Sequence, residues 1–360
     1  MLNFVYICKI MRITQKIFIS LLAAASLLSC AKISKESDNI ASKRALEAWV
    51  QVHYPDAVKT DKGIYILEDI QGKGQTIKDS SFVYYNFVTR KLYDSTITGY
   101  NQAEYAIQMN NYDKYGNYGP ALTQFIKGSA STTLQEILLG SEKMPAMKEG
   151  GKRTVILPGW ISESSQVYAT EADYLARVSG GTHTIYTVEF ISQKDDIYQD
   201  QIDNIEAYMK ANGMEICDTT GHKGLYFWRN RIREAQRGVT VKENYKFPKD
   251  TTIYIEYVGR LLDGKVFDTN IKDTAIKYGL GTRASSYTPS AVSWSADSSA
   301  IKLGGSTVIS GFSRTLWLMH PFESATGIFT SNYGYGASAS GARIPAYSPL
   351  IFEIDIVSKP

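Results

Sequence analysis

The sequence repeats itself once, over a distance too long for a solenoid. The segment LEAWV at residues 46–50, followed by KGIYIL at 62–67, has a counterpart in IEAYM at 205–209, followed by KGLYFW at 223–228. A repeat of this length indicates the duplication of a whole domain, each copy having a short helix and then a strand that opens a larger unit. The 360 residues are enough for two or three domains.

The second copy predicts strands with one covering helix. Apolar residues alternate with more polar ones over 253–257 and again over 350–356, as in half-buried strands. Phe312, Leu316 and Met319 recur at helical spacing between these segments and would cover the apolar face of a sheet. The predicted fold class is therefore α+β.

Short helices are expected ahead of each unit. Apolar residues recur at helical spacing from 202 to 209, and Asn212-Gly213 is a stop signal, so we predict a helix over about 200–212. A similar stripe lies within 45–50, and the small, polar residues 31–41 suit a tether. The predicted organisation is a tether and short helix (31–60), a first unit (61–195), a linker helix region (196–222) and a second unit (223–360).

The first thirty residues have the pattern of a targeting segment. Arg12 and Lys16 precede an apolar run at 17–28, which is too short to span a bilayer and ends at Leu27-Leu28-Ser29-Cys30. That ending resembles a bacterial lipobox, which implies that residues 1–30 are a lipoprotein signal peptide and that Cys30 is lipidated. The expected location is the cell envelope, lipid-anchored to a bacterial membrane, the outer membrane foremost, on its periplasmic or surface face. A plain signal peptide or a short buried helix is the alternative.

Composition excludes several classes of function. The net charge is only +3, and no Lys/Arg block accompanies the aromatic residues, so nucleic acid is not an expected partner. The four histidines are scattered without metal-ligand spacing, no Gly-x-Ser-x-Gly motif occurs, and Cys217 would be the sole thiol after processing. We expect no metal, no cofactor and no internal disulfide.

Five segments of the second unit resemble one enzyme family in both content and order. They are YVGRLLDGKVFD at 257–268, VISGF at 308–312, YGYGA at 333–337, RIP at 343–345 and LIFEI at 350–354. Together they resemble the FKBP-type peptidyl-prolyl cis–trans isomerases. The resemblance implies two FKBP-like domains, each an antiparallel sheet wrapped around a short helix, with the second helix at about 313–319.

The chemistry implied by this resemblance makes and breaks no bond. Rotation about a prolyl amide is slow because resonance flattens the peptide bond, with a barrier of about 20 kcal/mol. At the half-turned transition state the nitrogen is no longer conjugated, so the amide is less polar than in either ground state. Such a catalyst needs apolar walls around the proline ring and a few donors for the flanking carbonyls, but no nucleophile or metal.

The resemblance assigns the site residue by residue. Phe312 would be the pocket floor, Asp268 an acceptor at the mouth, and Ile344 the residue that closes the pocket from its loop. The Tyr335 hydroxyl and the Ile309 backbone N–H would hold substrate carbonyls. The residues that would line the pocket are Tyr257, Phe267, Val308, Ile309, Phe312 and Phe352. Read without the family, the apolar members of this set would be core residues of almost any sheet protein.

Several positions depart from the family pattern. Ser299 stands where a pocket aromatic is usual, at the end of the long Ser/Ala/Thr-rich run 284–299. Phe322 occupies a usual glycine turn, Gly327 interrupts the following strand, and Lys272 is near Asp268 but out of register as its basic partner. These departures predict a wider or slower pocket.

The first unit looks like a degenerate copy. It keeps Tyr85, Tyr93, Asp94 and Met147, and 187–191 would be its closing strand, with Tyr186 near the position of Phe352. It lacks the Asp-Gly hairpin, the Tyr-Gly pair and the Ile-Pro loop, so we expect the fold to be retained there and catalysis lost.

Two functions follow from these readings. The first is a lipid-anchored prolyl isomerase that assists the folding of exported proteins by acting on their Xaa-Pro bonds. The alternative is a non-catalytic lipoprotein that uses the same pocket to bind a peptide, or a glycan on its exposed aromatic residues. The oligomeric state is left open.

Overall fold

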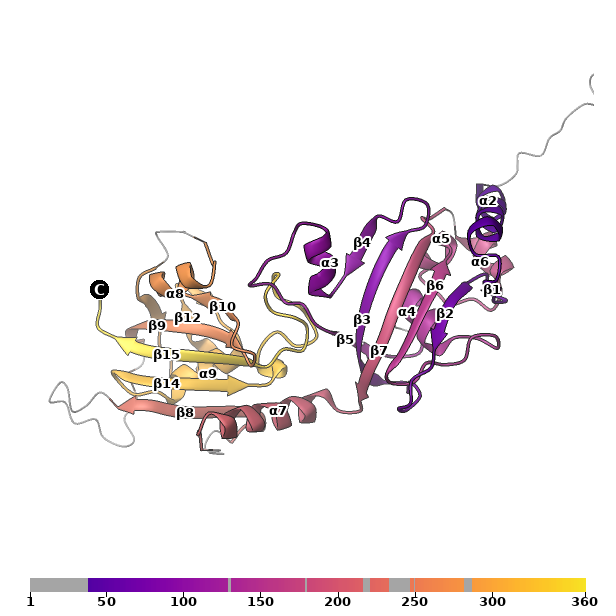
Figure 1. The fold of residues 1–360 in the computed structure, drawn as a ribbon. Helices are drawn as coiled ribbons and strands as arrows, with labels where there is room; N and C mark the ends of the chain where they lie inside the picture. The colour runs from indigo at the N-terminus through magenta and orange to yellow at the C-terminus, as the bar shows by residue number, and fades with distance from the viewer. Residues whose placement is uncertain are drawn as a thin grey trace, which may run out of the picture.

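Two antiparallel β-sheets joined by one long helix make up the molecule (Figure 1). The computed structural model describes residues 38–128, 131–178, 180–215, 221–232, 247–248, 250–281 and 287–360. Within these ranges no helix has both the length and the apolar character needed to cross a membrane. The α+β class predicted from the sequence is confirmed. Cys30 and Cys217 lie outside the described residues.

The first unit is built on a seven-stranded sheet in the order β1-β2-β6-β7-β3-β4, with β5 paired to β3. Its strands are β1 (Val58–Lys59), β2 (Tyr65–Ile70), β3 (Ser81–Lys91), β4 (Ile97–Tyr100), β5 (Ala121–Phe125), β6 (Gly151–Leu157) and β7 (Thr184–Lys194). Its helices are α2 (Asp38–His53), α3 (Ala103–Gln108), α4 (Thr132–Leu139), α5 (Gly159–Ser162) and α6 (Glu171–Arg177). Leu46 and Val50 of α2 and Ile137 of α4 are buried in the same apolar core.

Helix α2 begins within the segment that the sequence assigned to a tether. Residues 38–41 are helical, and residues 31–37 lie outside the described residues. The Asn39 side chain explains the early start, because its amide donates to the carbonyls of Leu175 and Val178 at the end of α6. Its oxygen accepts the Gly180 N–H at 3.0 Å. This contact joins residues far apart in the sequence, so local periodicity could not predict it.

The second unit is built on an eight-stranded sheet in the order β13-β12-β11-β9-β15-β14-β8, with β10 paired to β9. Its strands are β8 (Leu225–Ile232), β9 (Thr252–Leu261), β10 (Val266–Thr269), β11 (Ser290–Ser293), β12 (Lys302–Leu303), β13 (Ser306–Thr307), β14 (Glu323–Phe329) and β15 (Leu350–Val357). Its helices are α8 (Lys272–Lys277), α9 (Ser310–Leu318) and the short 3-10 turns η3 (Ser298–Ala300) and η4 (Ser331–Tyr333).

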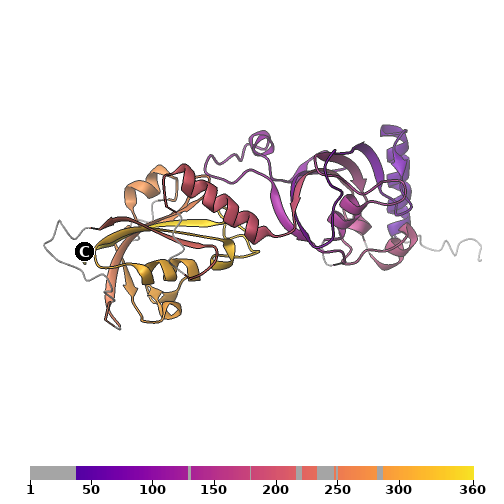
Figure 2. The same cartoon turned by 90° about the horizontal axis from the view of Figure 1, so that it is seen from below.

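Helices cover both faces of the second sheet (Figure 2). Helix α9 lies on one face and buries Phe312 and Leu316, with Met319 just beyond its end, as the helical spacing predicted. It begins three residues earlier than the expected 313–319, directly after Ile309. Helix α7 (Ile197–Ala211) packs Ile205 and Met209 on the other face.

The joining helix α7 also begins before its predicted start at about residue 200. Asp196 caps it, because the carboxylate accepts the N–H groups of Tyr198 at 2.9 Å and Gln199 at 3.1 Å. The helix ends at Asn212, as the Asn-Gly stop signal predicted. Acidic caps satisfy the free N–H groups of a first helical turn, and this cap lies ahead of the apolar stripe used for the prediction.

The two sheets share one connectivity. The order β2-β6-β7-β3 in the first unit corresponds to β8-β14-β15-β9 in the second. Strands β3 and β9 each carry two further partners, β4 and β5 in one case and β10 and β11 in the other. Met147 and Met319, which the sequence places in parallel, are both 1% exposed.

Gly327 does not interrupt its strand, contrary to expectation. Strand β14 runs unbroken and pairs with β15 on one side and β8 on the other. The glycine is explained by packing, because a Cβ at this position would lie 1.9 Å from the Thr315 hydroxyl of α9. Phe322 does occupy a glycine-like turn, with a φ of 59°.

Candidate functional site

A cavity of about 260 Å³ opens between α9 and the long strands β9 and β15. Because Tyr257 and Phe352 lie on the sheet face that α9 covers, their rings point toward Phe312 on the helix. We call this cavity the aromatic pocket. It is lined by Tyr257, Asp268, Leu303, Thr307, Val308, Ile309, Phe312, Tyr335 and Phe352.

A second hollow, of about 400 Å³, adjoins the aromatic pocket and shares Asp268, Tyr335 and Phe352 with it. We call it the outer hollow. It is lined by Phe267, Asp268, Tyr335, Ser340, Gly341, Ala342, Arg343, Ile344 and Phe352. The structure therefore brings together around one site every pocket residue that the sequence predicted.

Phe352 is the centre of an aromatic cluster. The centre of its ring lies 4.9 Å from that of Phe312 and 5.5 Å from that of Phe267, both edge to face. It also stacks on Phe329, with the ring centres 5.9 Å apart. Tyr257 meets Phe312 edge to face at 5.7 Å. Edge-to-face contacts favour a fixed arrangement of rings, so the walls of the pocket are apolar and well defined.

A β-bulge turns two neighbouring side chains toward the site. Strand β10 pairs Val266 with Arg260 and Asp268 with Gly259, which leaves Phe267 as the extra residue. Phe267 and Asp268 therefore both line the outer hollow, although neighbours on a regular strand point to opposite faces. The Asp-Gly hairpin ahead of the bulge is formed as predicted, with Gly264 at a φ of 84°.

Gly259 makes room for the pocket rings. A Cβ there would lie 2.6 Å from the ring of Phe267 and 3.0 Å from that of Phe352. The two rings occupy the space that a side chain on β9 would need. Sequence reasoning missed this role, and its only signal was a glycine within an otherwise alternating strand.

Asp268 is partnered by Tyr257. The Tyr257 hydroxyl donates to the Asp268 carboxylate at 2.9 Å. Although part of Asp268 remains open to solvent, the protein packed around the carboxylate raises its pKa, and the Tyr257 bond opposes that effect. Burial also raises the pKa of Tyr257, so the phenol stays a donor. Lys272, which lies near Asp268 in the sequence but out of register as its basic partner, makes no ion pair with Asp268.

Two hydrogen-bond donors of the aromatic pocket have no partner among the residues that the structure describes. The Tyr335 hydroxyl, on a side chain that is 39% exposed, is one. The Ile309 N–H, on the residue that directly precedes α9, is the other. Both groups can donate to a ligand, and a ligand that displaces water from the pocket must supply acceptors, because an unpaired donor in an apolar cavity costs free energy.

Polar residues hold Tyr257 in place, and no sequence pattern predicted them. Asn270 is 5% exposed, accepts the Tyr257 N–H at 2.8 Å and donates to the Ile255 carbonyl at 2.8 Å. The Thr269 hydroxyl donates to the Tyr257 carbonyl at 2.6 Å. Both follow the bulge, so they connect β9 to the segment that carries Asp268.

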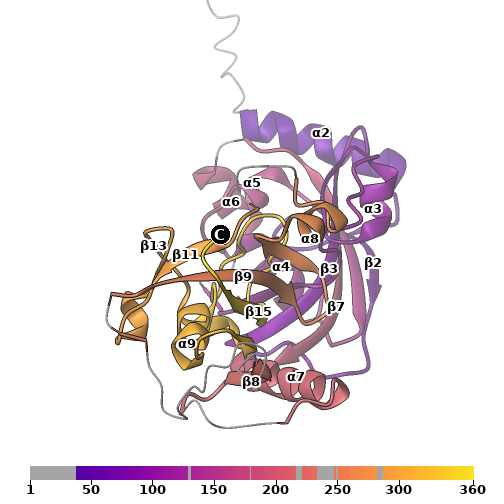
Figure 3. The same ribbon diagram turned by 90° about the vertical axis from the view of Figure 1, so that its left-hand side faces the viewer.

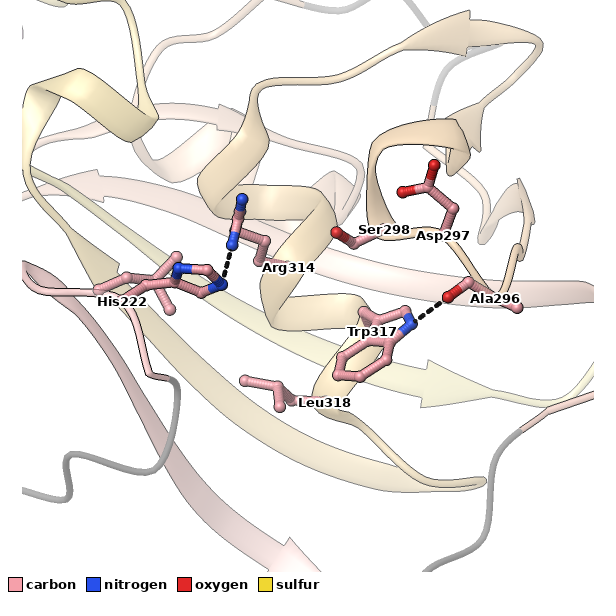
Figure 4. Close-up of a pocket in the computed structure, with 8 residues that line it drawn as sticks. His222, Ala296, Asp297, Ser298, Arg314, Trp317 and Leu318 are labelled. Carbon is pink, nitrogen blue, oxygen red and sulfur yellow. Dashed lines mark hydrogen bonds between the residues drawn. The ribbon is translucent and has the colours of Figure 1, made fainter.

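Ser299 lies outside the aromatic pocket, on η3, where its N–H and its hydroxyl both donate to the Asp297 carboxylate. Leu303 and Thr307 line that side of the pocket instead of an aromatic residue. The end of the long insertion folds against the outer face of α9, where the Trp317 indole N–H donates to the Ala296 carbonyl at 2.9 Å (Figure 4). A separate cavity of about 250 Å³ lies there, beside His222 and Arg314. Residues 282–286 are not described.

Comparison with known proteins identifies the family. Residues 243–357 match the family model of FKBP-type peptidyl-prolyl cis–trans isomerases. The chain is 30% identical over 148 residues to FK506-binding protein 2 of Kluyveromyces lactis, which covers 39% of this chain and 90% of that protein. The chain belongs to the FKBP-type peptidyl-prolyl cis–trans isomerases. This isomerase is also 24% identical over 197 residues to a probable FKBP-type peptidyl-prolyl cis–trans isomerase of Haemophilus influenzae, over 51% of this chain and 71% of that one.

Solved structures similar to this isomerase include the three FKBP domains of wheat FKBP73. That match has 17% identity and a TM-score of 0.26, and covers 83% of this chain and 95% of the other. A peptidyl-prolyl cis–trans isomerase of Pseudomonas syringae matches with 20% identity and a TM-score of 0.29, over 45% of this chain and 92% of the other.

The first unit of the isomerase does not assemble the same constellation. Asp94 is fully exposed and accepts the Thr96 N–H of its own turn at 2.9 Å, instead of pairing with Tyr85. Strand pairing makes Val188, and not Tyr186, the counterpart of Phe352. Val188 pairs with the residue two positions after Tyr85 on β3, and Phe352 pairs with the residue two positions after the equivalent tyrosine on β9. Tyr186 lies two residues along the same strand.

The Asp268 carboxylate should make stability depend on pH. Because the fold raises its pKa, the folded state favours the protonated form, and that stabilisation is lost as pH rises from about 4 through the folded pKa. We expect Asp268→Asn to be more stable than the wild type at pH 7, and this advantage to shrink at pH 3. The gain is small because part of the carboxylate faces water.

Urea unfolding of both proteins at the two pH values measures the difference. If the free energy of unfolding of the wild type rises relative to that of the variant as pH rises, the pocket stabilises the charge of Asp268 instead of penalising it.

Proposed function

We propose that the second unit is the catalytic centre and that it acts through the desolvated aromatic pocket. The observation that carries the proposal is a pair of donors, Tyr335 Oη–H and Ile309 N–H, that no described residue accepts from and that lie on the rim of a cavity walled by aromatic rings. A substrate with an apolar ring flanked by two carbonyls fits this arrangement. An Xaa-Pro segment has those groups.

The mechanism follows from the polarity of the twisting amide. The proline ring enters the aromatic pocket and packs against Phe312 and Phe352, whose dry surroundings favour the less polar half-turned state over either planar state. Tyr335 and Ile309 hold the flanking carbonyls, so that one side of the bond is fixed while the other turns. Tyr257 and Asp268 fix each other at the mouth through their hydrogen bond.

We further propose that the substrates are exported, unfolded proteins and that the chain is anchored by lipid on Cys30. The leader pattern at residues 1–30 supports this location. The first unit would be a non-catalytic copy of the fold. Its exposed Asp94, which pairs within its own turn, supports that assignment.

The test is isomerisation of a chromogenic tetrapeptide with one Xaa-Pro bond by the full chain. Tyr335→Phe removes one donor and should lower kcat/KM about tenfold, as expected for one lost hydrogen bond to a buried carbonyl. Tyr198→Phe is a matched control, because Tyr198 is similarly exposed at 38% but lies on α7, outside the pocket. It should leave kcat/KM unchanged.

An inactive wild type would overturn the catalytic proposal. If that protein still bound the peptide, with Tyr335→Phe weakening the binding, the site would be a peptide-binding site. Binding of an oligosaccharide in place of the peptide would favour the glycan-binding alternative.

A further inference from the structure

One connection of the first unit reaches across to the second (Figures 1 and 3). Residues 109–119, between α3 and β5, carry Tyr112, Tyr115 and Tyr118, and we call this segment the tyrosine loop. Tyr112 and Tyr118 stack on each other at 5.3 Å. Asp113 braces the turn between them, because its carboxylate accepts the Tyr115 N–H at 2.9 Å and its N–H donates to the Tyr118 phenol oxygen at 2.9 Å.

The base of the tyrosine loop is fixed to the first sheet. The Asn101 side chain donates to the Gly119 carbonyl at 2.9 Å and accepts the Phe87 N–H of β3 at 2.9 Å. The Gly119 N–H donates to the Asn101 carbonyl at 3.0 Å. The loop is therefore held by the first unit in a defined shape.

The tip of the tyrosine loop contacts the second unit at several points. The Tyr115 hydroxyl donates to the Lys277 carbonyl at 2.7 Å, and the Asn117 amide donates to the Arg343 carbonyl. The Arg343 guanidinium lies over the Tyr115 ring, 5.4 Å from its centre. Gly279 permits the approach, because a Cβ there would lie 2.5 Å from that ring.

Arg343 connects two walls of the outer hollow. Its guanidinium donates to the carbonyls of Val266 at 3.2 Å, Tyr278 at 2.8 Å and Gly279 at 2.8 Å. Val266 directly precedes Phe267 and Asp268 in the chain, and Ile344 directly follows Arg343. The position of Arg343 therefore sets the distance between the wall on the bulge and the wall on the loop of Ile344.

The whole segment from Ser331 to Tyr347 is held from outside the second sheet. This segment, which we call the rim loop, carries Tyr335 and Ile344. Gln201 of α7, 2% exposed, donates to the Tyr347 carbonyl at 3.0 Å and accepts the Ser331 N–H at 2.7 Å, so it fixes both ends. Between these ends, the tyrosine loop holds the rim loop at Arg343.

We propose that Tyr115 and Asn117 of the first unit are positioning residues for substrate binding in the second unit. They act through Arg343 to hold the rim loop, so the two units together build one peptide-binding site. The inference rests on the proposed function, since the rim loop carries the groups assigned to the substrate. It gives the first unit a role in the reaction that does not depend on catalysis there.

The experiment uses the full chain and the variant Tyr115→Ala/Asn117→Ala. We expect KM for the same tetrapeptide to rise about tenfold, with kcat within twofold, because the lost contacts hold the rim loop that grips the bound peptide and do not touch the turning bond. Amide hydrogen exchange over residues 340–345 should become faster. Tyr105→Ala, whose ring contacts Tyr100 and Arg90 within the first unit, should change neither quantity.

Each outcome decides the inference. An unchanged KM overturns it, whether or not the exchange becomes faster, and so does a loss confined to kcat. If the wild type does not isomerise the peptide, the proposed function fails separately, and the Kd for the same peptide then takes the place of KM. A Kd that the double variant leaves unchanged overturns the inference, and a Kd that rises about tenfold together with faster exchange supports it.

Discussion

Gly327→Ala is expected to destabilise the second unit by about 3 to 5 kcal/mol and to lower its Tm by roughly 10 °C. The added methyl group would lie 1.9 Å from the Thr315 hydroxyl, and Thr315 is 0% exposed. Thr315 has no alternative position without cost, because its hydroxyl donates to the Gly311 carbonyl at 2.8 Å. Helix α9 would have to move away from β14, and the pocket floor on α9 would move with it.

Thermal unfolding of the full chain measures this effect. Gly119→Ala is the control, because nothing lies within 4 Å of its added Cβ and it should cost little. Thr315→Ala combined with Gly327→Ala removes the two closest atoms and should recover part of the lost stability. A Gly327→Ala protein that melts like the wild type would mean that α9 does not approach β14 this closely.

Phe267→Ala is expected to lower kcat/KM for an Xaa-Pro peptide by about tenfold to a hundredfold. Phe267 is a half-buried wall of the outer hollow and meets Phe352 edge to face at 5.5 Å. Removing it admits water and takes away an apolar contact of about 1.5 to 3 kcal/mol, most of which acts on the less polar transition state. The bulge and Gly259 do not depend on this ring for their backbone geometry, so the fold should survive.

Two further variants make the result specific. Phe267→Leu keeps an apolar wall and should lower kcat/KM by less than about fivefold. Ile276→Ala removes a side chain that is 55% exposed on nearby α8 and should leave the rate unchanged. Wild-type kinetics in Phe267→Ala would contradict a role for this wall in the reaction.

The pocket could be predicted because its residues lie in five short motifs that resemble one family, whereas the local patterns alone predicted strands, a hairpin and a covering helix. Tyr257 and Phe352 follow strand alternation, Phe312 follows helical spacing, and the Asp-Gly turn sets the hairpin before Phe267. Each of these signals needs only a few neighbouring residues. The fold class followed from the same patterns.

What the sequence did not predict depends on contacts between distant segments. The start of α2 depends on Asn39 reaching α6, and the need for Gly327 becomes visible only when α9 lies across β14. The bulge at Phe267 is a change of register that composition does not reveal. The contact of Asn117 with Arg343 joins residues of different units, so no periodicity in either unit could indicate it.

The packing of α7 has a practical consequence for truncation. Gln201 bonds to Ser331 and Tyr347, and Ile205 and Met209 share an apolar cluster with Ile328 and Ile351. A fragment cut at residue 223 would expose one face of the β-sheet to water and free both ends of the rim loop. Anyone shortening the gene for crystallisation or ligand screening should therefore place the cut ahead of Asp196.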